Sequence, residues 1–304
     1  MRWGKHPPTT ALYEACESLG RAPDTVLHFT ADTGPILRTR TPSIVTVHGI
    51  ASRWIDGVRR KPAEKVWRTR VSRAISSADA VVTVSASSAK DVAAVFNIDE
   101  KAINVIPHGI DYERFSRPSG LSLQAGSAVP REFMLYIGNI EPRKNVDALC
   151  EAFSSQIVQN LGIQLVIAGR PAWAYGQTMQ RISNTPGIIY LGEVSDEDVV
   201  ALLQRAKLFV FPSRYEGFGF PVLEAMASGC PVLTTRRGAL NEVAGPAATV
   251  DDLDPEAIAE GIVACLADEE WLDATSRSGR LWAQDFSWDR SVESHLELYK
   301  QVLR

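Results

Sequence analysis

The stretch EGFGFPVLEA (216–225) carries two carboxylates, Glu216 and Glu224, on either side of two glycines and a proline. Glycines let a backbone approach a ligand or adopt positive φ. Pro221 suits the first turn of a helix, whose N–H groups and dipole would then point at a ligand. Carboxylates in such a loop are suited to accept hydrogen bonds from vicinal hydroxyls of sugars and riboses. The alternative, a helix-capping Glu plus a surface Glu, leaves the glycines and the proline unexplained.

A second group of residues favours phosphate. In YIGNIEPRKN (136–145) a predicted strand ends at Gly138, and Arg143 and Lys144 stand just before a helix that begins near Val146. Adjacent cations beside helix N–H groups form a phosphate site. The alternative is an ordinary pair of solvated loop cations.

Two more predicted strands end in turns, in LVIAGRPAW (165–173) and YLGEVSDED (190–198). Their backbone groups are candidates for holding the flat base of a nucleotide, although simple turn chemistry explains them equally well. Ligands of open parallel sheets bind at the carboxyl ends of the strands, where all four stretches fall. Each stretch is weak evidence alone, and together they are specific.

The elements that must position these residues follow an α/β pattern. Short β-branched runs alternate with helical stretches, which predicts parallel sheets with crossover helices. A stretch rich in Ser, Gly and Pro (117–132) separates two sets of runs and predicts two domains, 1–120 and 130–286. The expected strands lie at 25–29, 43–48, 80–84 and 103–106 in the first domain, and at 133–138, 164–169, 188–191, 208–211, 231–234 and 247–250 in the second.

Helix signals support this division. Ser195 before three acidic residues predicts a capped helix, and Pro255 predicts a helix start. The last stretch (287–304) predicts a helix with Val292, Leu296, Tyr299 and Val302 or Leu303 on one apolar face, which must dock. We expect this helix to pack back on the first domain.

Composition bounds the class of protein. At 304 residues, with 45% hydrophobic and 22% charged residues, the chain is typical of a two-domain globular protein. A net charge of -4 argues against nucleic acid as a partner. The cysteines Cys16, Cys150, Cys230 and Cys265 lack metal-binding spacing, so we interpret them as reduced, mostly buried thiols of a cytoplasmic protein. Neither a signal peptide nor a membrane span is predicted.

These motifs, with VVTVSASSAKDV, VIPHGID and the closing FSWDRSVESHLELY, resemble the retaining glycosyltransferases of family 4. The resemblance is strongest over 80–304. It implies a GT-B fold, in which two Rossmann-like domains face a cleft, and a nucleotide diphosphate sugar donor. By the same resemblance, Glu224 holds the ribose, Glu216 contacts the donor sugar, and Arg143 and Lys144 neutralise the diphosphate.

The resemblance extends to further residues. Backbone N–H groups of Phe218, Gly219 and Phe220 would approach the sugar and diphosphate, with Pro221 in the first turn of the helix that follows. His48, after the strand SIVTVH, would reach the donor sugar, although a lone His at such a place is more often structural, as we expect for His108. The remaining residues expected to line the donor site are Gly138, Asn139, Gly169, Arg170 and Val194.

The chain departs from the family at two places. Asn139 follows Gly138 where many members have a basic residue. The chain opens with a predicted helix, RWGKHPPTTALYEACESLG (2–20), instead of the usual strand and Gly-rich loop, which suggests a shortened first domain, a start further upstream, or a partner-dependent enzyme.

The function expected from these features is transfer of a hexose such as mannose or glucose, with retention, from a GDP- or UDP-sugar. The acceptor would be a hydroxyl of a cell-envelope polysaccharide, a glycolipid or a small molecule. No cofactor and no essential metal is expected, because Arg143 and Lys144 already neutralise the phosphates. The alternative is a sugar-nucleotide-binding module with weak or no catalysis.

The basic segment VRRKPAEKVWRTRVSR (58–73) raises a question of location. It carries seven cations against Glu64 alone, and such a helix can lie on anionic lipid at the inner face of a membrane. The alternative is a solvated helix face whose apolar side, Val66, Trp67, Val71 and Ala74, packs on the first domain's sheet.

Overall fold

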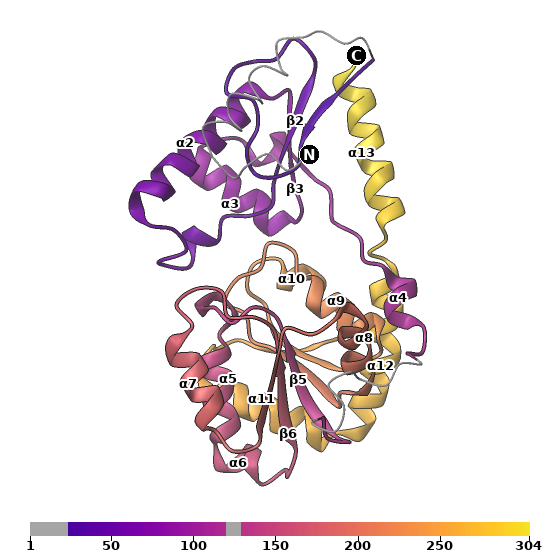
Figure 1. Ribbon diagram of the computed structural model, residues 1–304. Helices are drawn as coiled ribbons and strands as arrows, with labels where there is room; N and C mark the ends of the chain where they lie inside the picture. The colour runs from indigo at the N-terminus through magenta and orange to yellow at the C-terminus, as the bar shows by residue number, and fades with distance from the viewer. Residues whose placement is uncertain (1–23, 120–128) are drawn as a thin grey trace. The chain divides into compact units, whose positions relative to one another are not determined.

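The computed structural model describes residues 24–119 and 129–304, which form two compact units (Figure 1). The first unit comprises the chain up to His108 together with Asp289–Arg304, and the second comprises Gly109–Trp288. The division falls earlier than the expected boundary near 120. The predicted opening helix (2–20) and Cys16 lie outside the described residues, as does 120–128 of the expected linker.

The first unit is built on a parallel sheet of strands in the order β1-β2-β3-β4. Successive residues of a strand point to opposite faces, so Ile44 and Val45 of β2 belong to two different apolar clusters. The strands are β1 (Leu27–Phe29), β2 (Ser43–Val47), β3 (Ala80–Thr83) and β4 (Ile103–Val105).

Helices cover both faces of this sheet (Figure 1). Val71 and Ala74 of α2 pack with Val92 of α3 on one face, and Leu298 of α13 packs with Ile44 on the other. The helices are η1 (Ala51–Arg53), α2 (Lys61–Ser77), α3 (Ala86–Phe96), η2 (Glu100–Ala102) and α13 (Trp288–Val302), whose first residue belongs to the second unit.

Two predicted apolar faces differ in the structure. In α13 the docked residues are Leu298, Tyr299 and Val302, while Val292 and Leu296 are 52% and 48% exposed. In α2 Val71 and Ala74 are buried and Trp67 packs against the core, but Val66 is 59% exposed. Periodicity of apolar residues does not decide which of two overlapping stripes meets the sheet.

The second unit is a parallel sheet in the order β10-β9-β8-β5-β6-β7. This is the doubly wound Rossmann arrangement, in which the strand order reverses between β5 and β8. The strands are β5 (Phe133–Ile137), β6 (Gln164–Ala168), β7 (Ile188–Gly192), β8 (Leu208–Phe211), β9 (Val232–Thr235) and β10 (Ala248–Val250), so all ten predicted strands are confirmed.

Helices flank this second sheet (Figure 1). The predicted helix starts are confirmed, because Ser195 Oγ accepts from the Asp198 amide at 3.1 Å and Pro255 opens α11. The helices are α4 (Tyr112–Ser116), η4 (Pro142–Lys144), α5 (Val146–Ser154), α6 (Gln156–Gln159), α7 (Gly176–Asn184), α8 (Asp196–Arg205), α9 (Phe220–Ala227), α10 (Leu240–Val243), α11 (Pro255–Ala267) and α12 (Glu269–Gln284).

Two passages of the chain lie side by side in the second unit. The Ile110 amide donates to the Phe286 carbonyl at 2.9 Å, and a Cβ on Gly109 would lie 2.1 Å from the Trp288 nitrogen. Only glycine fits there. The side chain of Gln204 in α8 donates to the carbonyls of Phe115 and Arg117, which explains why α4 belongs to this unit.

Candidate functional site

The candidate site begins where β5 and β6 end. Gly138 and Gly169 follow these strands with φ of +152° and +141°, a region that favours glycine. A Cβ on Gly169 would lie 1.9 Å from the Gly138 carbonyl oxygen. The two strand ends are therefore as close as backbones can be, and the loop after β5 is held against the sheet.

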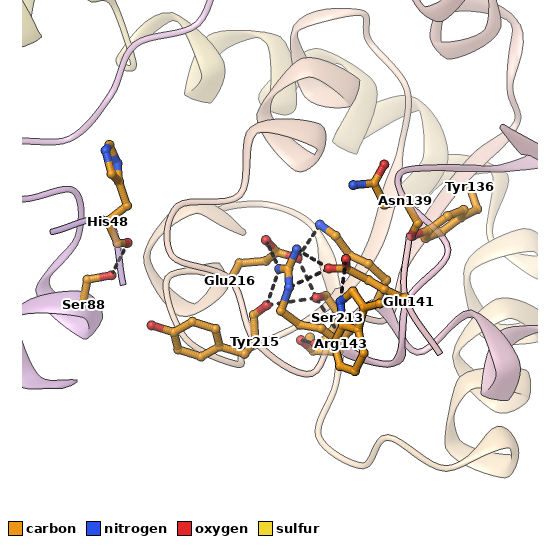
Figure 2. Close-up of polar contacts among 12 residues, drawn as sticks. His48, Ser88, Tyr136, Asn139, Glu141, Arg143, Ser213, Tyr215 and Glu216 are labelled. Carbon is orange, nitrogen blue, oxygen red and sulfur yellow. Dashed lines mark hydrogen bonds and ion pairs between the residues drawn. The ribbon is translucent and has the colours of Figure 1, made fainter. Parts of the chain in front are cut away.

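That loop turns through η4 and brings Arg143 to three oxygens. Its Nε and Nη2 donate to Glu141 Oε1 at 2.9 and 2.8 Å. Its Nη1 donates to Glu216 Oε2 at 2.7 Å and to the Tyr215 carbonyl at 2.9 Å (Figure 2). These bonds use four of the five guanidinium N–H groups. Arg143 therefore links the loop after β5 to the loop after β8.

Lys144 and Glu216 form a buried ion pair beside it. Lys144 Nζ donates to Glu216 Oε1 at 2.7 Å, and both residues are 7% exposed. Ser213 Oγ donates to the same carboxylate oxygen at 2.6 Å. Burial disfavours ionisation of Glu216, but Lys144 and Arg143 outweigh it and hold the pKa of this carboxyl below its usual range. The carboxylate is ionised with two cations bound.

Sequence spacing alone does not bring these residues together, because they come from two different strand ends. Arg143 and Lys144 follow β5, Glu216 follows β8, and β5 and β8 are neighbours. Between them lies the point at which the strand order reverses. In doubly wound sheets this crevice is where ligands bind.

The start of α9 is the next part of the site. Gly219 is its N-cap residue with φ of +112°, and no side chain caps the helix. A Cβ on Gly219 would lie 2.9 Å from Val243 Cγ2, so close packing and backbone shape both require glycine. Phe220 begins the helix and Pro221 is its second residue. Phe218 is buried, and its ring contacts Phe220 edge to face.

Glu224 lies one helical turn further along α9. It is half-buried, and among the described residues no side-chain hydrogen bond to its carboxyl is found. Burial is the main cause that raises its pKa from 4.5 to about 7, partly offset by the charge of Arg114. The two acids of the opening motif thus have opposite electrostatic environments.

The residues expected to hold a nucleotide base lie at the ends of β6 and β7. Exposed Arg170 follows Gly169, and half-buried Val194 directly precedes the α8 cap Ser195. Asn139 is exposed, and its carbonyl accepts from the Tyr136 hydroxyl at 3.0 Å. These positions are compatible with the predicted roles and do not test them.

His48 belongs to the first unit, where it follows β2. Its Nε2 lies 2.7 Å from the Thr30 carbonyl, which can only accept, so this nitrogen carries the proton. Nδ1 is then the acceptor for His108 Nε2 at 3.3 Å. Burial lowers the pKa of His108 to about 4. Both ring nitrogens of His48 therefore have partners within the unit, and its contact with a sugar stays a prediction.

Three residues of the site were not foreseen. Glu141 accepts from Arg143 through one oxygen and from Trp173 Nε1, at 3.1 Å, through the other. Ser213 lies buried beneath Glu216. An acid two residues before Arg143 was a usable signal for Glu141. Ser213 lies only three residues before Glu216, so its contact is local in sequence. Nothing local indicated Trp173, which follows β6 and meets Glu141 because β5 and β6 are neighbours.

Metal-binding clusters and membrane-spanning helices are both absent from the described residues. Within 24–119 and 129–304, no three His, Cys, Asp or Glu side chains gather where they could hold a metal ion. Over the same ranges, no helix has the length and apolar composition needed to cross a bilayer. Cys150, Cys230 and Cys265 are buried free thiols, as predicted.

A buried cation, a half-buried acid and an uncapped helix start lie together at the carboxyl edge of a Rossmann sheet, which makes this a candidate nucleotide site. Two parallel α/β units, the second of which carries this candidate site, are the architecture of GT-B glycosyltransferases. Comparison with known proteins narrows this class. The model of "Glycosyltransferase Family 4" matches residues 6–114, and that of "Glycosyl transferases group 1" matches 131–268.

Individual relatives agree. O-antigen chain mannosyltransferase B of Escherichia coli is 31% identical over 85% of this chain and 70% of its own length. MMP alpha-(1->4)-mannosyltransferase of Mycolicibacterium hassiacum is 28% identical over 88% of this chain and 64% of its own length. A glycosyltransferase structure from Rickettsia africae shares the fold, with a TM-score of 0.72 at 18% identity over all of this chain and 84% of that one. The chain belongs to glycosyltransferase family 4.

Proposed function

We propose that the protein transfers a hexosyl group, mannosyl in the first instance, from a nucleotide diphosphate sugar to an acceptor hydroxyl, with retention at the anomeric carbon. The observation that carries this proposal is the buried Lys144 and Glu216 pair between the ends of β5 and β8. Mannosyl transfer is favoured because two relatives are named mannosyltransferases. The donor is a GDP- or UDP-sugar.

The two cations then have different roles. Lys144 Nζ donates one of its three N–H groups to Glu216, and its remaining N–H groups donate to the diphosphate. Arg143 has most of its N–H groups engaged by protein oxygens, so it positions Glu216 more than it binds phosphate. Glu224 accepts from the ribose, and Glu216 faces the donor sugar.

The reaction that fits these roles breaks the bond between the anomeric carbon and the phosphate oxygen. The diphosphate leaves with the bonding electron pair, stabilised by Lys144 and by the N-terminus of α9. The acceptor hydroxyl attacks from the same face, and its proton passes to the leaving phosphate oxygen. Glu216 is ion-paired with two cations, so it is not a nucleophile of the kind that retaining glycosidases use.

The experiment is a transfer assay paired with calorimetry on Lys144→Ala. We expect transfer to fall steeply and the affinity for a nucleoside diphosphate to drop about tenfold or more, because a charge-assisted bond is worth about 1.5–3 kcal/mol. Affinity for the matching nucleoside should stay within about twofold, since Lys144 is proposed to contact phosphate only. Equal loss for both ligands would contradict the phosphate role.

The alternative is a sugar-nucleotide-binding module with weak or no catalysis. Nucleotide binding does not separate the two functions, whereas transfer or donor hydrolysis does. Independence from metal also belongs to the proposal, and full loss of transfer on adding a chelator would contradict it. A thermal-shift screen of UDP, GDP, ADP and dTDP with their sugars would identify the donor, because a ligand of the folded state raises its stability.

The proposed acceptors are hydroxyls of cell-envelope polysaccharides, glycolipids or small molecules, reached from the cytoplasm. If the acceptor is a glycolipid, we propose that segment 58–73 reversibly contacts the inner face of the membrane that holds it. Cations near an anionic surface contribute about 1 kcal/mol each, and salt weakens them. Sedimentation with anionic vesicles at low and high salt tests this contact.

A further inference from the structure

A cavity of about 840 Å³ lies in the first unit, beside the start of α2. Its walls come from the segment between η1 and α2 and from the first turns of α2. We call it the basic pocket, because five cations line it against two carboxylates, Asp56 and Glu64. The cations are Arg59, Arg60, Lys61, Lys65 and Arg68.

Glu64 organises one wall of the basic pocket. Its carboxylate accepts from Ser52 Oγ at 2.6 Å, from Arg68 Nε at 2.7 Å and from Arg59 Nη1 at 3.3 Å. The Arg59 guanidinium also stacks on the ring of Trp67 at 4.1 Å. Two planar guanidinium groups are thus held in place, each with most of its N–H groups not engaged by Glu64.

The remaining three cations, Arg60, Lys61 and Lys65, are exposed to solvent. Within the described part of the chain, the side chains of Arg60, Lys61 and Lys65 form no ion pair. Five cations around one cavity repel one another, since each pair of like charges at close range is unfavourable. The start of α2 adds to this positive potential, because Arg60 is its N-cap residue and no side chain caps the helix.

An anion with several oxygens satisfies all of these groups at once. Guanidinium forks pair with phosphate through two parallel bonds, and lysines add charge around it. The cavity volume lies within the range of about 300–1,000 Å³ typical of small-molecule sites, and it exceeds what one phosphate needs. The pocket therefore has room for an organic group beside the phosphate.

We propose that the basic pocket binds the phosphate or diphosphate group of a phosphorylated ligand, free or as a lipid headgroup. No residue of this pocket belongs to the second unit, which holds Lys144 and Glu216. The pocket is a site additional to the proposed donor site. We further propose that this ligand is the acceptor of the transfer reaction, an assignment that rests on the proposed function. Phosphate binding by the pocket does not depend on that function.

The test is a calorimetric titration of the full chain with inorganic pyrophosphate at physiological salt. The variant is Arg60→Ser with Lys65→Ser, because these side chains form no ion pair among the described residues and their loss should not impair folding. The matched control is Arg73→Ser, an exposed cation at the other end of α2 and outside the pocket. Circular dichroism and Tm verify that all variants fold.

We expect the double variant to weaken pyrophosphate binding about tenfold or more, the loss typical of removing charge-assisted contacts, and Arg73→Ser to change it less than about twofold. Pyrophosphate can also bind in the second unit, so the conclusion depends on the difference between the variants. Equal effects of both variants would overturn the proposal, since the attraction would then be diffuse.

A second arm separates the two sources of phosphate. Phosphatidylcholine vesicles with and without phosphatidic acid are sedimented with the same variants. Binding that needs phosphatidic acid and is lost only in Arg60→Ser with Lys65→Ser supports the pocket with a lipid headgroup as its ligand. Pyrophosphate binding without vesicle binding supports it with a free phosphorylated ligand. Binding of neither probe overturns the proposal. Neither arm contains a sugar donor, so failure here leaves sugar transfer untouched.

Discussion

Glu224 combines a half-buried position with a proposed role that requires charge. Its pKa of about 7, against an ordinary 4.5, means that the folded state holds its proton longer than the unfolded state. The stability that this group affects is therefore fully present below pH 4.5 and is lost as pH rises towards 7. Above pH 7 the ionised carboxylate destabilises the fold and is free to accept from ribose hydroxyls.

We accordingly expect Glu224→Gln to be more stable than the natural chain at pH 8, with Tm higher by about 2–4 °C for a gain of about 1 kcal/mol. At pH 5 the two should match more closely. The same variant should bind nucleoside about tenfold more weakly at pH 8, because bonds to charged groups are the stronger ones. Calorimetry and thermal unfolding at both pH values test this, and lower stability at pH 8 would contradict it.

Glu141 acts on Glu216 through Arg143. Its side chain is 9% exposed and lies between Arg143 and Trp173. We expect Glu141→Gln to reduce turnover by about tenfold to a hundredfold, the effect of small misplacement of a reacting group, and to leave nucleotide affinity within about twofold.

The matched control for this prediction is Glu151→Gln. Glu151 also pairs with an arginine, Arg181, but its side chain is 52% exposed, and surface pairs contribute little. Steady-state kinetics and nucleotide titration of both variants decide the matter. Normal turnover in Glu141→Gln, or an equal fall in both variants, would show that the contact does not position the site.

A polar contact accompanies the apolar ones that attach helix α13 to the first sheet. The Tyr299 hydroxyl lies 2.6 Å from Nδ1 of His28, and Nε2 of the same ring lies 2.7 Å from Thr46 Oγ1. Removing the hydroxyl leaves a ring nitrogen of β1 without its partner. We expect Tyr299→Phe to lower the free energy of unfolding of the first unit by about 1 kcal/mol.

Leu296→Ala is the control on the same helix, since Leu296 is 48% exposed and surface changes stay within about 0.5 kcal/mol. Urea unfolding measures both variants. A larger loss for Leu296→Ala would mean that the exposed stripe of α13 carries more of the attachment than the face with Tyr299.

His28 also makes the stability of the first unit depend on pH. Burial, with smaller contributions from His295 and His48, lowers the pKa of His28 from 6.5 to about 4. The neutral ring is favoured in the folded state, so this stability is fully present above pH 6.5 and is lost as pH falls towards 4. Unfolding at stepwise lower pH should show the loss, and His28→Gln should make it shallower. An unchanged slope would exclude His28, leaving His108, whose pKa is also lowered to about 4.

The last helix of the chain, α13, packs with the first unit, although the second unit precedes it in sequence. Residues Asp289–Arg304 group with the chain up to His108, and Leu298 covers Ile44, Val82 and Ile106. We expect a chain ending at Trp288 to lose order in the first sheet, seen as faster amide exchange in β2 and β3. Nucleoside diphosphate binding, a property of the second unit in our proposal, should survive. Loss of that binding with intact exchange protection in β2 and β3 would contradict this independence.

Local patterns along the chain were enough to predict the ten strands of the described residues, the helix starts at Ser195 and Pro255, and the loops that carry the candidate residues. These features depend on side chains close in sequence, and the amino-acid sequence shows their spacing and their capping residues directly. The resemblance of the motifs likewise indicated the family before any contact was known.

The tertiary structure decided what depends on distant partners. Strand order makes β5 a neighbour of both β8 and β6. The first pairing explains why Arg143 and Lys144 meet Glu216, and the second explains why Trp173 meets Glu141. The docked face of α13 was also decided there. Two apolar stripes overlap on that helix, and the shape of the sheet selected Leu298 and Tyr299 over Val292 and Leu296, because burial free energy depends on the surface that a side chain meets.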